Sequence, residues 1–190
     1  MNFCSMCGAE VIFQIPAHDD RERYVCSSCD TVHYQNPKLI VGCIPVWDDQ
    51  ILLCQRAIEP RSGYWTLPAG FMELGETLTE AARRETLEEA HARVDIQHLY
   101  VVINLPHVNQ VYLMFRSRLR DQEYKAGTES TDVRLFTEAE IPWDNLAFST
   151  IRYTLEHYFQ DRNTGQYPLH LGDILKKENR YIFRPGPESS

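Results

Sequence analysis

The spacing of apolar residues predicts several strands in the middle of the chain. Residues 38–47, KLIVGCIPVW, are β-branched and apolar on both faces, which is typical of a strand buried on both sides. A polar turn at 48–50 follows, and ILLCQR at 51–56 predicts the returning strand. Further strands are predicted near 94–104, 110–120 and 133–137.

Two segments have the pattern of helices. Residues 77–91 begin with Thr77-Leu78-Thr79-Glu80, a threonine N-cap with glutamate three positions later, which forms a capping box. Ser149 is placed to cap a last helix that ends near residue 160. Helical spacing predicts that this helix buries the stripe Ile151, Leu155, Tyr158 and Phe159. A single helical turn, closed by Pro142, is predicted within 137–143.

These elements predict three parts in the chain. Strands mixed with two helices indicate an α/β domain with a mixed sheet between helices, at residues 35–162. Residues 1–34 form a small module with paired cysteines. Glycines and prolines in 163–190 predict an irregular C-terminal tail.

Composition and charge limit the partners of the protein. The chain has 190 residues, of which 43% are hydrophobic, enough for the core of one ordinary domain. With 19 basic and 27 acidic residues its net charge is −8, which argues against nucleic-acid and membrane-surface partners. A phosphate substrate stays compatible with this charge, because a bound cation can reverse the local field.

The sequence also bears on the compartment. No run approaches the roughly 20 apolar residues of a membrane span. The first residues, MNFCSMCGAEV, lack the basic and apolar regions of a secretory signal. Six cysteines in a chain without an export signal indicate reduced thiols or metal rather than disulfides. We therefore expect a cytoplasmic protein.

Four cysteines have the spacing of a structural zinc site. Cys4 and Cys7 form one C-x2-C pair, Cys26 and Cys29 form another, and 18 residues separate the pairs. Two thiolates from each pair would complete a closed tetrahedron around Zn²⁺. Gly8 and Asp30 follow the two pairs, at positions where the turn requires positive φ. Two reactive redox pairs are the alternative. Cys43 and Cys54 lie in apolar runs and are interpreted as buried core thiols.

A nucleic-acid-binding role for the small module is disfavoured by its charge. Its only fixed positive charges are Arg21 and Arg23. The opposing acidic residues are Glu10, Asp19, Asp20, Glu22 and Asp30. A negative module is a poor partner for a phosphate backbone, so a structural or dimer-forming role is expected.

Three glutamates in the first helix occupy an unusual position. Spacings of three and four place Glu85, Glu88 and Glu89 on one side of the helix, where like charges repel. On a helical wheel Glu88 and Glu89 lie about 60° and about 40° from Glu85, on the same side as Leu78 and Ala81. A solvated acidic face would lie opposite this apolar stripe. Partly buried carboxylates without partners need cations, and hard oxygen ligands suit Mg²⁺ or Mn²⁺. The alternative is an ordinary exposed helix with i,i+4 ion pairs.

The residues around these glutamates resemble the Nudix box. The stretch GFMELGETLTEAARRETLEEAHA, from residue 70, carries the glycine and charged positions of that motif. These positions are Gly70, Glu76, Arg84, Glu85, Glu88 and Glu89. Thr86 replaces the usual large aliphatic residue and His91 replaces the second glycine, but neither departure removes a carboxylate. The resemblance covers about residues 38–160, and the module in front resembles the zinc ribbon of one branch of the family.

The resemblance implies a fold, a reaction and a set of site residues. The fold is an α/β/α sandwich with a mixed sheet, and the reaction is hydrolysis of a nucleoside diphosphate linked to another group. Glu85, Glu88 and Glu89 are the implied Mg²⁺ ligands, helped by the backbone carbonyl of Ala69 or Gly70. Glu76 and Arg84 would form a structural ion pair. The general base is left open between Glu85 and Glu129, and Glu129 can equally be an ordinary solvated loop acid. A homodimer is expected from the family.

The substrate is less well defined by sequence. NADH pyrophosphatases carry a proline- and tryptophan-rich array after the box, and residues 93–115 lack it. The stretches YQNPKLIVGC, WTLPAGFMELGET and LFTEAEIPWDNLAFS resemble the plant FAD/ADP-ribose pyrophosphatases. Arg56 could clamp a phosphate, and Tyr64, Trp65 and Tyr112 could stack on a ring, although core packing is the commoner role of aromatic residues. An NADH or capped-RNA pyrophosphatase and a non-catalytic Nudix scaffold are the alternatives.

Overall fold

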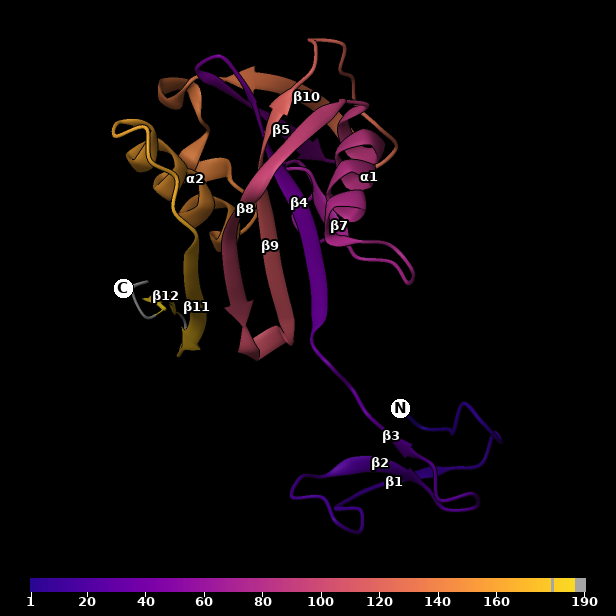
Figure 1. Ribbon diagram of the computed structural model, residues 1–190. Coiled ribbons are helices and arrows are strands. Elements are labelled where there is room, and N and C mark those ends of the chain that lie inside the picture. Colours follow the sequence, from indigo (N-terminus) through magenta and orange to yellow (C-terminus); the bar gives the residue numbers. More distant parts are fainter. Residues whose placement is uncertain (179, 187–190) are drawn as a thin grey trace. The chain divides into compact units, whose positions relative to one another are not determined.

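The chain is divided into two compact units in the computed structural model, Met1–Pro37 and Lys38–Ser190 (Figure 1). The structure describes residues 1–178 and 180–186. The division lies close to the predicted end of the small module at residue 34.

The small unit is a three-stranded antiparallel sheet with almost no apolar core. Its strands are β1 (Val11–Gln14), β2 (Arg23–Cys26) and β3 (Val32–His33), in the order β1-β2-β3. Its buried hydrophobic residues are Cys4, Val25 and Cys26. Large apolar side chains of the same unit, such as Phe3, Met6 and Phe13, are exposed. Burial alone therefore cannot hold this unit together.

The second unit is built on a mixed nine-stranded sheet. Seven strands lie in the order β10-β5-β4-β9-β8-β11-β12, while β6 pairs with β5 and β7 with β4. The pairs β4–β9 and β8–β11 are parallel and the other pairs are antiparallel. The strand bounds are β4 (Lys38–Trp47), β5 (Gln50–Arg56), β6 (Trp65–Thr66), β7 (Ala69–Phe71), β8 (Val94–Leu105), β9 (Gln110–Leu119), β10 (Ser130–Phe136), β11 (His170–Lys177) and β12 (Arg180–Pro185).

Two helices cover opposite faces of this sheet, α1 (Leu78–Ala90) and α2 (Ser149–Arg162) (Figure 1). Alternate residues of β4 point to opposite faces. Ile40 and Ile44 pack in one core cluster with α2, whereas Val41 and Cys43 pack in the other with α1. Three short 3₁₀ turns complete the unit: η1 (Pro106–Val108), η2 (Glu138–Glu140) and η3 (Trp143–Asn145). The α/β/α sandwich predicted from the sequence is confirmed.

Local sequence determines both ends of α1. Thr77 and Glu80 form the predicted capping box, in which the Glu80 amide donates to Thr77 Oγ1 at 3.3 Å and the Thr77 amide donates to Glu80 Oε2 at 2.8 Å. At the other end His91 adopts φ 48° and its amide donates to the Leu87 carbonyl at 2.9 Å. Histidine therefore ends the helix in the left-handed region where the family pattern has glycine.

The predicted N-cap of α2 is wrong. The N-cap of α2 is Phe148, without a side-chain cap bond, and Ser149 is already the first helical residue. The stripe of buried residues predicted for this helix is nevertheless correct.

The predicted irregular tail instead contains the hairpin β11–β12. Strand β11 pairs in parallel with β8, for example Leu171 with Val102, and antiparallel with β12, for example Leu175 with Ile182. Glycines and prolines suggested a loop because the partner strand β8 is distant in sequence, and local composition carries no information about that pairing. Among the described residues, no helix is long and apolar enough to span a membrane.

Candidate active site

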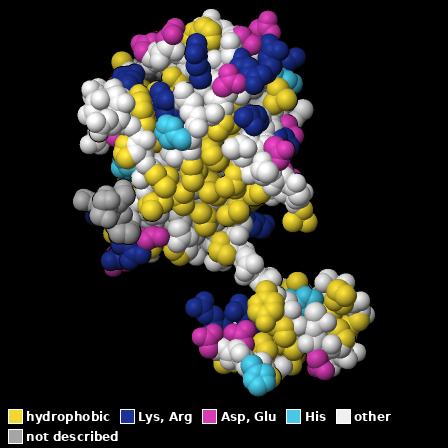
Figure 2. Space-filling view, viewed as in Figure 1, with side chains coloured by type: hydrophobic (Ala, Val, Ile, Leu, Met, Phe, Trp, Pro, Cys, Tyr) yellow, Lys and Arg dark blue, Asp and Glu magenta, His cyan; other side chains and the backbone are white. Residues whose placement is uncertain are grey.

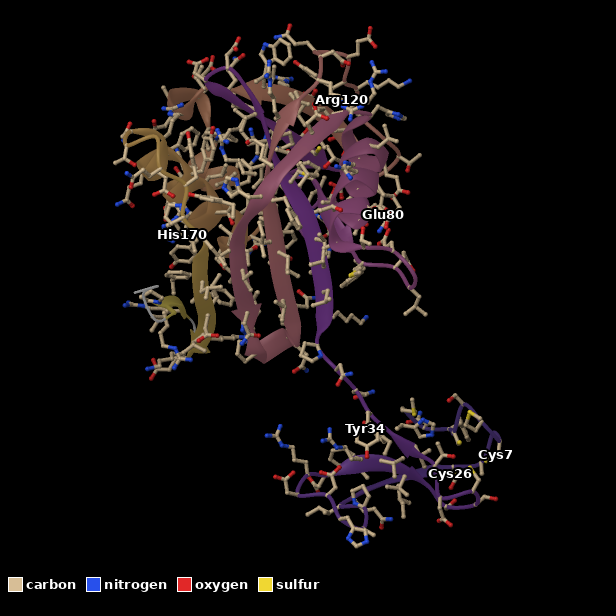
Figure 3. All side chains as sticks on the ribbon, viewed as in Figure 1. Cys7, Cys26, Tyr34, Glu80, Arg120 and His170 are labelled. Atoms are coloured by element: carbon tan, nitrogen blue, oxygen red, sulfur yellow. The ribbon has the colours of Figure 1, made fainter. Side chains whose placement is uncertain are left out.

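The four paired cysteines converge at one end of the small unit. Their sulfur atoms all lie within 4.8 Å of one another, with Cys4 Sγ 3.8 Å from Cys29 Sγ and Cys7 Sγ 3.5 Å from Cys26 Sγ. Figure 3 shows Cys7 and Cys26 side by side. Four sulfurs about 2.3 Å from a tetrahedral metal would lie about 3.8 Å apart, so the spacing fits a Cys₄ metal site.

Backbone geometry supports the same interpretation of this cluster. The amides of Met6 and Ser28 each donate to a cysteine sulfur at 3.4 Å, which stabilises negative charge on a metal-binding thiolate. Gly8 and Asp30 adopt φ 77° and φ 55°, as predicted from their positions after the cysteine pairs.

The large unit contains a separate cavity of about 570 Å³ beside α1, lined by side chains from several elements. Its acidic lining residues are Glu59, Glu73, Glu85, Glu88, Glu89 and Glu129. Two arginines, Arg56 and Arg84, also line it. The rest of the lining includes the aromatic side chains Phe71, Tyr112 and Phe148. A cavity with both charge signs and aromatic walls suits an anionic ligand that carries rings.

Two of the three helix glutamates are buried at this cavity. Glu85 and Glu89 are each only 8% exposed, whereas the Glu88 side chain is 59% exposed. Burial, reinforced by the charge of Glu85, raises the pKa of Glu89 to about 8. Burial also raises the pKa of Glu85, against the opposing effect of Arg84. The predicted partial burial of the three glutamates is therefore confirmed for Glu85 and Glu89 but wrong for Glu88, which is exposed and paired with Arg84.

Arg84 connects the acidic residues of the loop and the helix. Its guanidinium donates to both carboxylate oxygens of Glu76, at 2.7 and 3.0 Å, and to Glu85 Oε1 at 2.6 Å. It also donates to Glu88 Oε2 at 3.0 Å and to the Phe71 carbonyl at 3.1 Å. The hydrogen bonds from Arg84 lower the pKa of Glu76 to about 2. The ion pair expected between Glu76 and Arg84 is present.

Backbone groups hold the loops that surround the carboxylates. The Ala69 amide donates to Glu89 Oε2 at 3.2 Å, the only hydrogen bond to this carboxylate among the described residues. The Gly127 amide donates to the Glu89 carbonyl at 3.0 Å, which docks the loop of Glu129 on the end of α1. The charge of Glu129 acts on both buried glutamates, so this loop acid lies with the helix acids and not apart from them.

Gly70 explains why a glycine is required at the start of the box. A Cβ at this position would overlap the carboxylate of Glu85. We expect Gly70→Ala to lower kcat by about 10- to 100-fold, because the added methyl group would displace the carboxylate of Glu85, the expected metal ligand. The melting temperature should change little, because the displaced atoms are the end of a flexible side chain. Activity assays beside thermal unfolding check this, and an unchanged kcat would contradict it.

Gly127 is a second position without room for a side chain. A Cβ there would overlap the Glu88 carbonyl oxygen, so the whole loop must move away from α1. We expect Gly127→Ala to cost about 1–3 kcal/mol of unfolding free energy and to lower kcat by moving Glu129. Gly172→Ala is the matched control. Its Cβ would overlap the Phe183 ring, and neither residue lines the cavity. Equal kcat losses in both variants would show that Gly127 acts only through stability.

The predicted substrate-contacting residues are only partly brought together. Arg56 and Tyr112 line the cavity, but Tyr64 and Trp65 do not. Trp65 is buried in the core and meets Phe136 edge to face at 4.9 Å, while Tyr64 lies against Arg61. Phe148, whose ring lies 5.2 Å from the Arg56 guanidinium carbon, lines the cavity but was not predicted from the sequence. The sequence around Phe148, at the start of α2, contains no motif that indicates a position at the cavity.

The carboxylate oxygens of the glutamates are suitable ligands for a divalent cation, although they do not yet converge on one point. Their oxygens are hard donors, and the buried carboxylate of Glu89 has no cationic partner among the described residues. Among the described residues only the four cysteine sulfurs already converge to ligand distance. Carboxylate side chains on one helix and one loop can adjust by rotation, so the donor set suits Mg²⁺ or Mn²⁺.

The fold and this site define a class of α/β/α hydrolase-like proteins with acidic residues on a loop–helix–loop. The family model of the NUDIX domain matches residues 36–158, and that of the Nudix N-terminal zinc ribbon matches residues 2–35. The chain belongs to the Nudix hydrolase family.

Known structures and curated proteins agree with this assignment. A crystal structure of a NUDIX hydrolase from Nitrosomonas europaea is 57% identical, covers 93% of this chain and 100% of its own, and has a TM-score of 0.90. An ADP-ribose pyrophosphatase from Streptococcus suis shares the fold at 20% identity and a TM-score of 0.57, covering 72% of this chain and 98% of its own.

The curated relatives of this chain are named NAD-capped RNA hydrolases. The NAD-capped RNA hydrolase NudC of Photobacterium profundum is 37% identical over 95 residues, which are 49% of this chain and 33% of that protein. NudC of Edwardsiella ictaluri is 38% identical over 109 residues, 55% of this chain and 38% of that protein. The chain thus spans about a third of the length of these relatives.

Proposed function

We propose that the protein is a divalent-metal-dependent pyrophosphohydrolase that splits a nucleoside diphosphate linked to a second group. The observation that carries the proposal is the burial of Glu85 and Glu89 in a cavity that also holds Arg56. Burying two carboxylates costs folding energy, and a cation site for a phosphate substrate accounts for that cost. Mg²⁺ or Mn²⁺ supplies Lewis-acid chemistry that neutralises charge on a pyrophosphate.

The protein's own residues would orient the substrate and handle the proton. Arg56 is placed to donate to a phosphate oxygen, and it stays oriented by its bond to the Pro60 carbonyl at 2.9 Å. Water adds across the P–O–P bond, so one proton must leave the attacking water. Glu85 and Glu129 both line the cavity and are the candidates to accept it.

The relatives favour an NAD-type substrate over FAD or ADP-ribose, which the sequence resemblance placed first. Several curated relatives are named NAD-capped RNA hydrolases. We therefore propose NAD(H), free or as the 5′ end of an RNA, as the first substrate to test. This revises the expectation that no nucleic acid is involved, which came from the net charge of −8.

Product analysis tests the reaction and the substrate together. NADH, an NAD-capped RNA, FAD and ADP-ribose are offered separately with Mg²⁺ or Mn²⁺, and the products are separated by chromatography. AMP with a nicotinamide mononucleotide is expected from NADH, and kcat/KM ranks the four. Faster turnover of FAD or ADP-ribose would reverse the substrate order but keep the chemistry. No product with either metal would overturn the proposal and favour a non-catalytic scaffold.

We also propose that the four-cysteine cluster holds a structural zinc ion and that the protein is a homodimer. The sulfur spacing supports the first proposal. Analytical ultracentrifugation tests the second.

A further inference from the structure

The hairpin β11–β12 has a charge pattern opposite to that of the rest of the chain. Residues 170–186 contain four basic residues, Lys176, Lys177, Arg180 and Arg184, and only two acidic ones, within a chain of net charge −8. One of the acids is already used. Asp173 accepts from Arg184 Nε at 3.0 Å and from Asn104 Nδ2 at 3.1 Å. The other acid, the exposed Glu178, lies beside Lys177, so the three basic residues at the end of the hairpin and this acid leave a net charge of 3 − 1 = +2.

Two cations at this end face each other directly. Lys177 is the cross-strand partner of Arg180, and the exposed neighbour Lys176 is opposite Tyr181. Like charges directly opposite destabilise an antiparallel pair. Among the described residues no ion pair joins Lys176, Lys177 or Arg180 to an acid. Figure 2 shows basic side chains next to acidic ones at the lower left of the large unit.

Aromatic rings accompany these charges. Tyr181 is 52% exposed, and its ring centroid lies 5.5 Å from that of His107 in η1. Phe183 stacks on Tyr153 of α2 at 4.7 Å, which fixes the hairpin on the helix. Cationic side chains interleaved with an exposed aromatic ring are the features that bind single-stranded nucleic acid.

The hairpin contacts two residues that lie close in sequence to the lining of the cavity, His107 and Tyr153. His107 precedes Gln110, which lines the cavity, by three residues. Tyr153 follows Ile151, which also lines the cavity, by two residues. The hairpin therefore packs against two segments that continue into the lining of the cavity.

We propose that the end of the β11–β12 hairpin, with Lys176, Lys177, Arg180 and Tyr181, binds the RNA chain of a 5′-capped substrate. The dinucleotide end would occupy the cavity, and the following phosphates would lie on the basic surface. The identity of the anion as RNA rests on the proposed function. Basic residues on an edge strand also discourage aggregation, which is the competing explanation for their presence.

Binding of RNA is measured first, because it does not depend on turnover. Fluorescence anisotropy of an NAD-capped RNA of about 10 nucleotides is recorded without divalent cation, for the full chain and for the variant Lys176→Gln, Lys177→Gln, Arg180→Gln. We expect binding about tenfold weaker, or more, in the variant. The slope of log K against log salt should fall by about 2, for three contacts at about 0.7 each.

A matched variant removes three basic residues from the end of β9 and the loop that follows it. Arg118→Gln, Arg120→Gln, Lys125→Gln removes the same charge, and Figure 3 shows Arg120 at the opposite end from the hairpin. This control should keep the RNA affinity. Equal losses in both variants would show that only the net charge matters, and would overturn the proposal.

Kinetics separate this proposal from the proposed function. The hairpin variant should raise KM for the capped RNA and leave kcat/KM for free NADH unchanged. If NADH is hydrolysed but the variant binds and hydrolyses capped RNA like the unaltered protein, the hairpin proposal is wrong and the reaction stands. If RNA binds through the hairpin but no dinucleotide is hydrolysed, the proposed reaction is wrong and the binding surface stands. Aggregation of the variant with unchanged RNA affinity would assign the basic residues to edge protection.

Discussion

Replacing Glu89 by glutamine should abolish most of the activity while making the fold more stable. Loss of one charged group from an active site typically lowers kcat on the order of 10²- to 10⁴-fold. Glutamine keeps the size of the side chain and can still accept the Ala69 amide bond seen at 3.2 Å. It removes a carboxylate whose pKa burial has raised to about 8. At neutral pH without divalent cations, the unfolding free energy should rise by about 1–3 kcal/mol.

The opposite signs of these two effects make the test specific. A structural carboxylate would lose stability when neutralised, whereas a carboxylate reserved for a cation gains it. Glu156→Gln on α2 is the matched control, because this side chain is 47% exposed and its 3.5 Å pair with Arg152 is a surface ion pair of little energy. kcat with Mg²⁺ and urea unfolding with a chelator are measured for both variants. A Glu89→Gln protein that is active, or that is less stable, would contradict the role proposed for this residue.

The helical wheel predicted this part of the site well because the signal is local. Helix periodicity relates the direction of Glu85 and Glu89 to that of Leu78 and Ala81 within a few turns. The structure adds what periodicity omits, since Glu88 is displaced towards solvent and is held by Arg84. The capping box, the left-handed His91 and the turns after the cysteine pairs were also predicted from short stretches of sequence.

Features that depend on distant pairing were not predicted. The hairpin β11–β12 exists because β8 offers an edge more than 60 residues earlier in the chain, as in the pairing of Leu171 with Val102. The position of Phe148 in the cavity wall likewise depends on where α2 packs. The aromatic residues predicted from sequence do not line the cavity: Trp65 lies in β6, and Tyr64 directly precedes that strand. The direction of a side chain in a half-buried loop is set by tertiary packing, which composition does not encode.

We expect the small unit to depend on metal, because it has almost no apolar core. Its strands are four residues or fewer, and an isolated sheet of this kind is marginal in water. Structural zinc in zinc-finger peptides contributes about 10–16 kcal/mol of apparent binding free energy, which is folding free energy for such a module. The four sulfurs are the feature of the unit that can supply stability of this size.

Removing the metal should therefore unfold residues 1–37 and leave the large unit folded. We expect elemental analysis to find one zinc per chain. Amide resonances of β1 to β3 should collapse to random-coil positions on chelation or in Cys26→Ser, while those of β4, β8 and β9 remain dispersed. Cys54→Ser is the matched control, because this thiol is buried in the core of the large unit and lies outside the cluster. That variant should keep its zinc and its folded small unit, since the lost thiol contacts only the main core. A small unit that keeps dispersed resonances without metal, or a pair of disulfides in place of zinc, would show that the cysteines serve redox chemistry or covalent cross-linking instead.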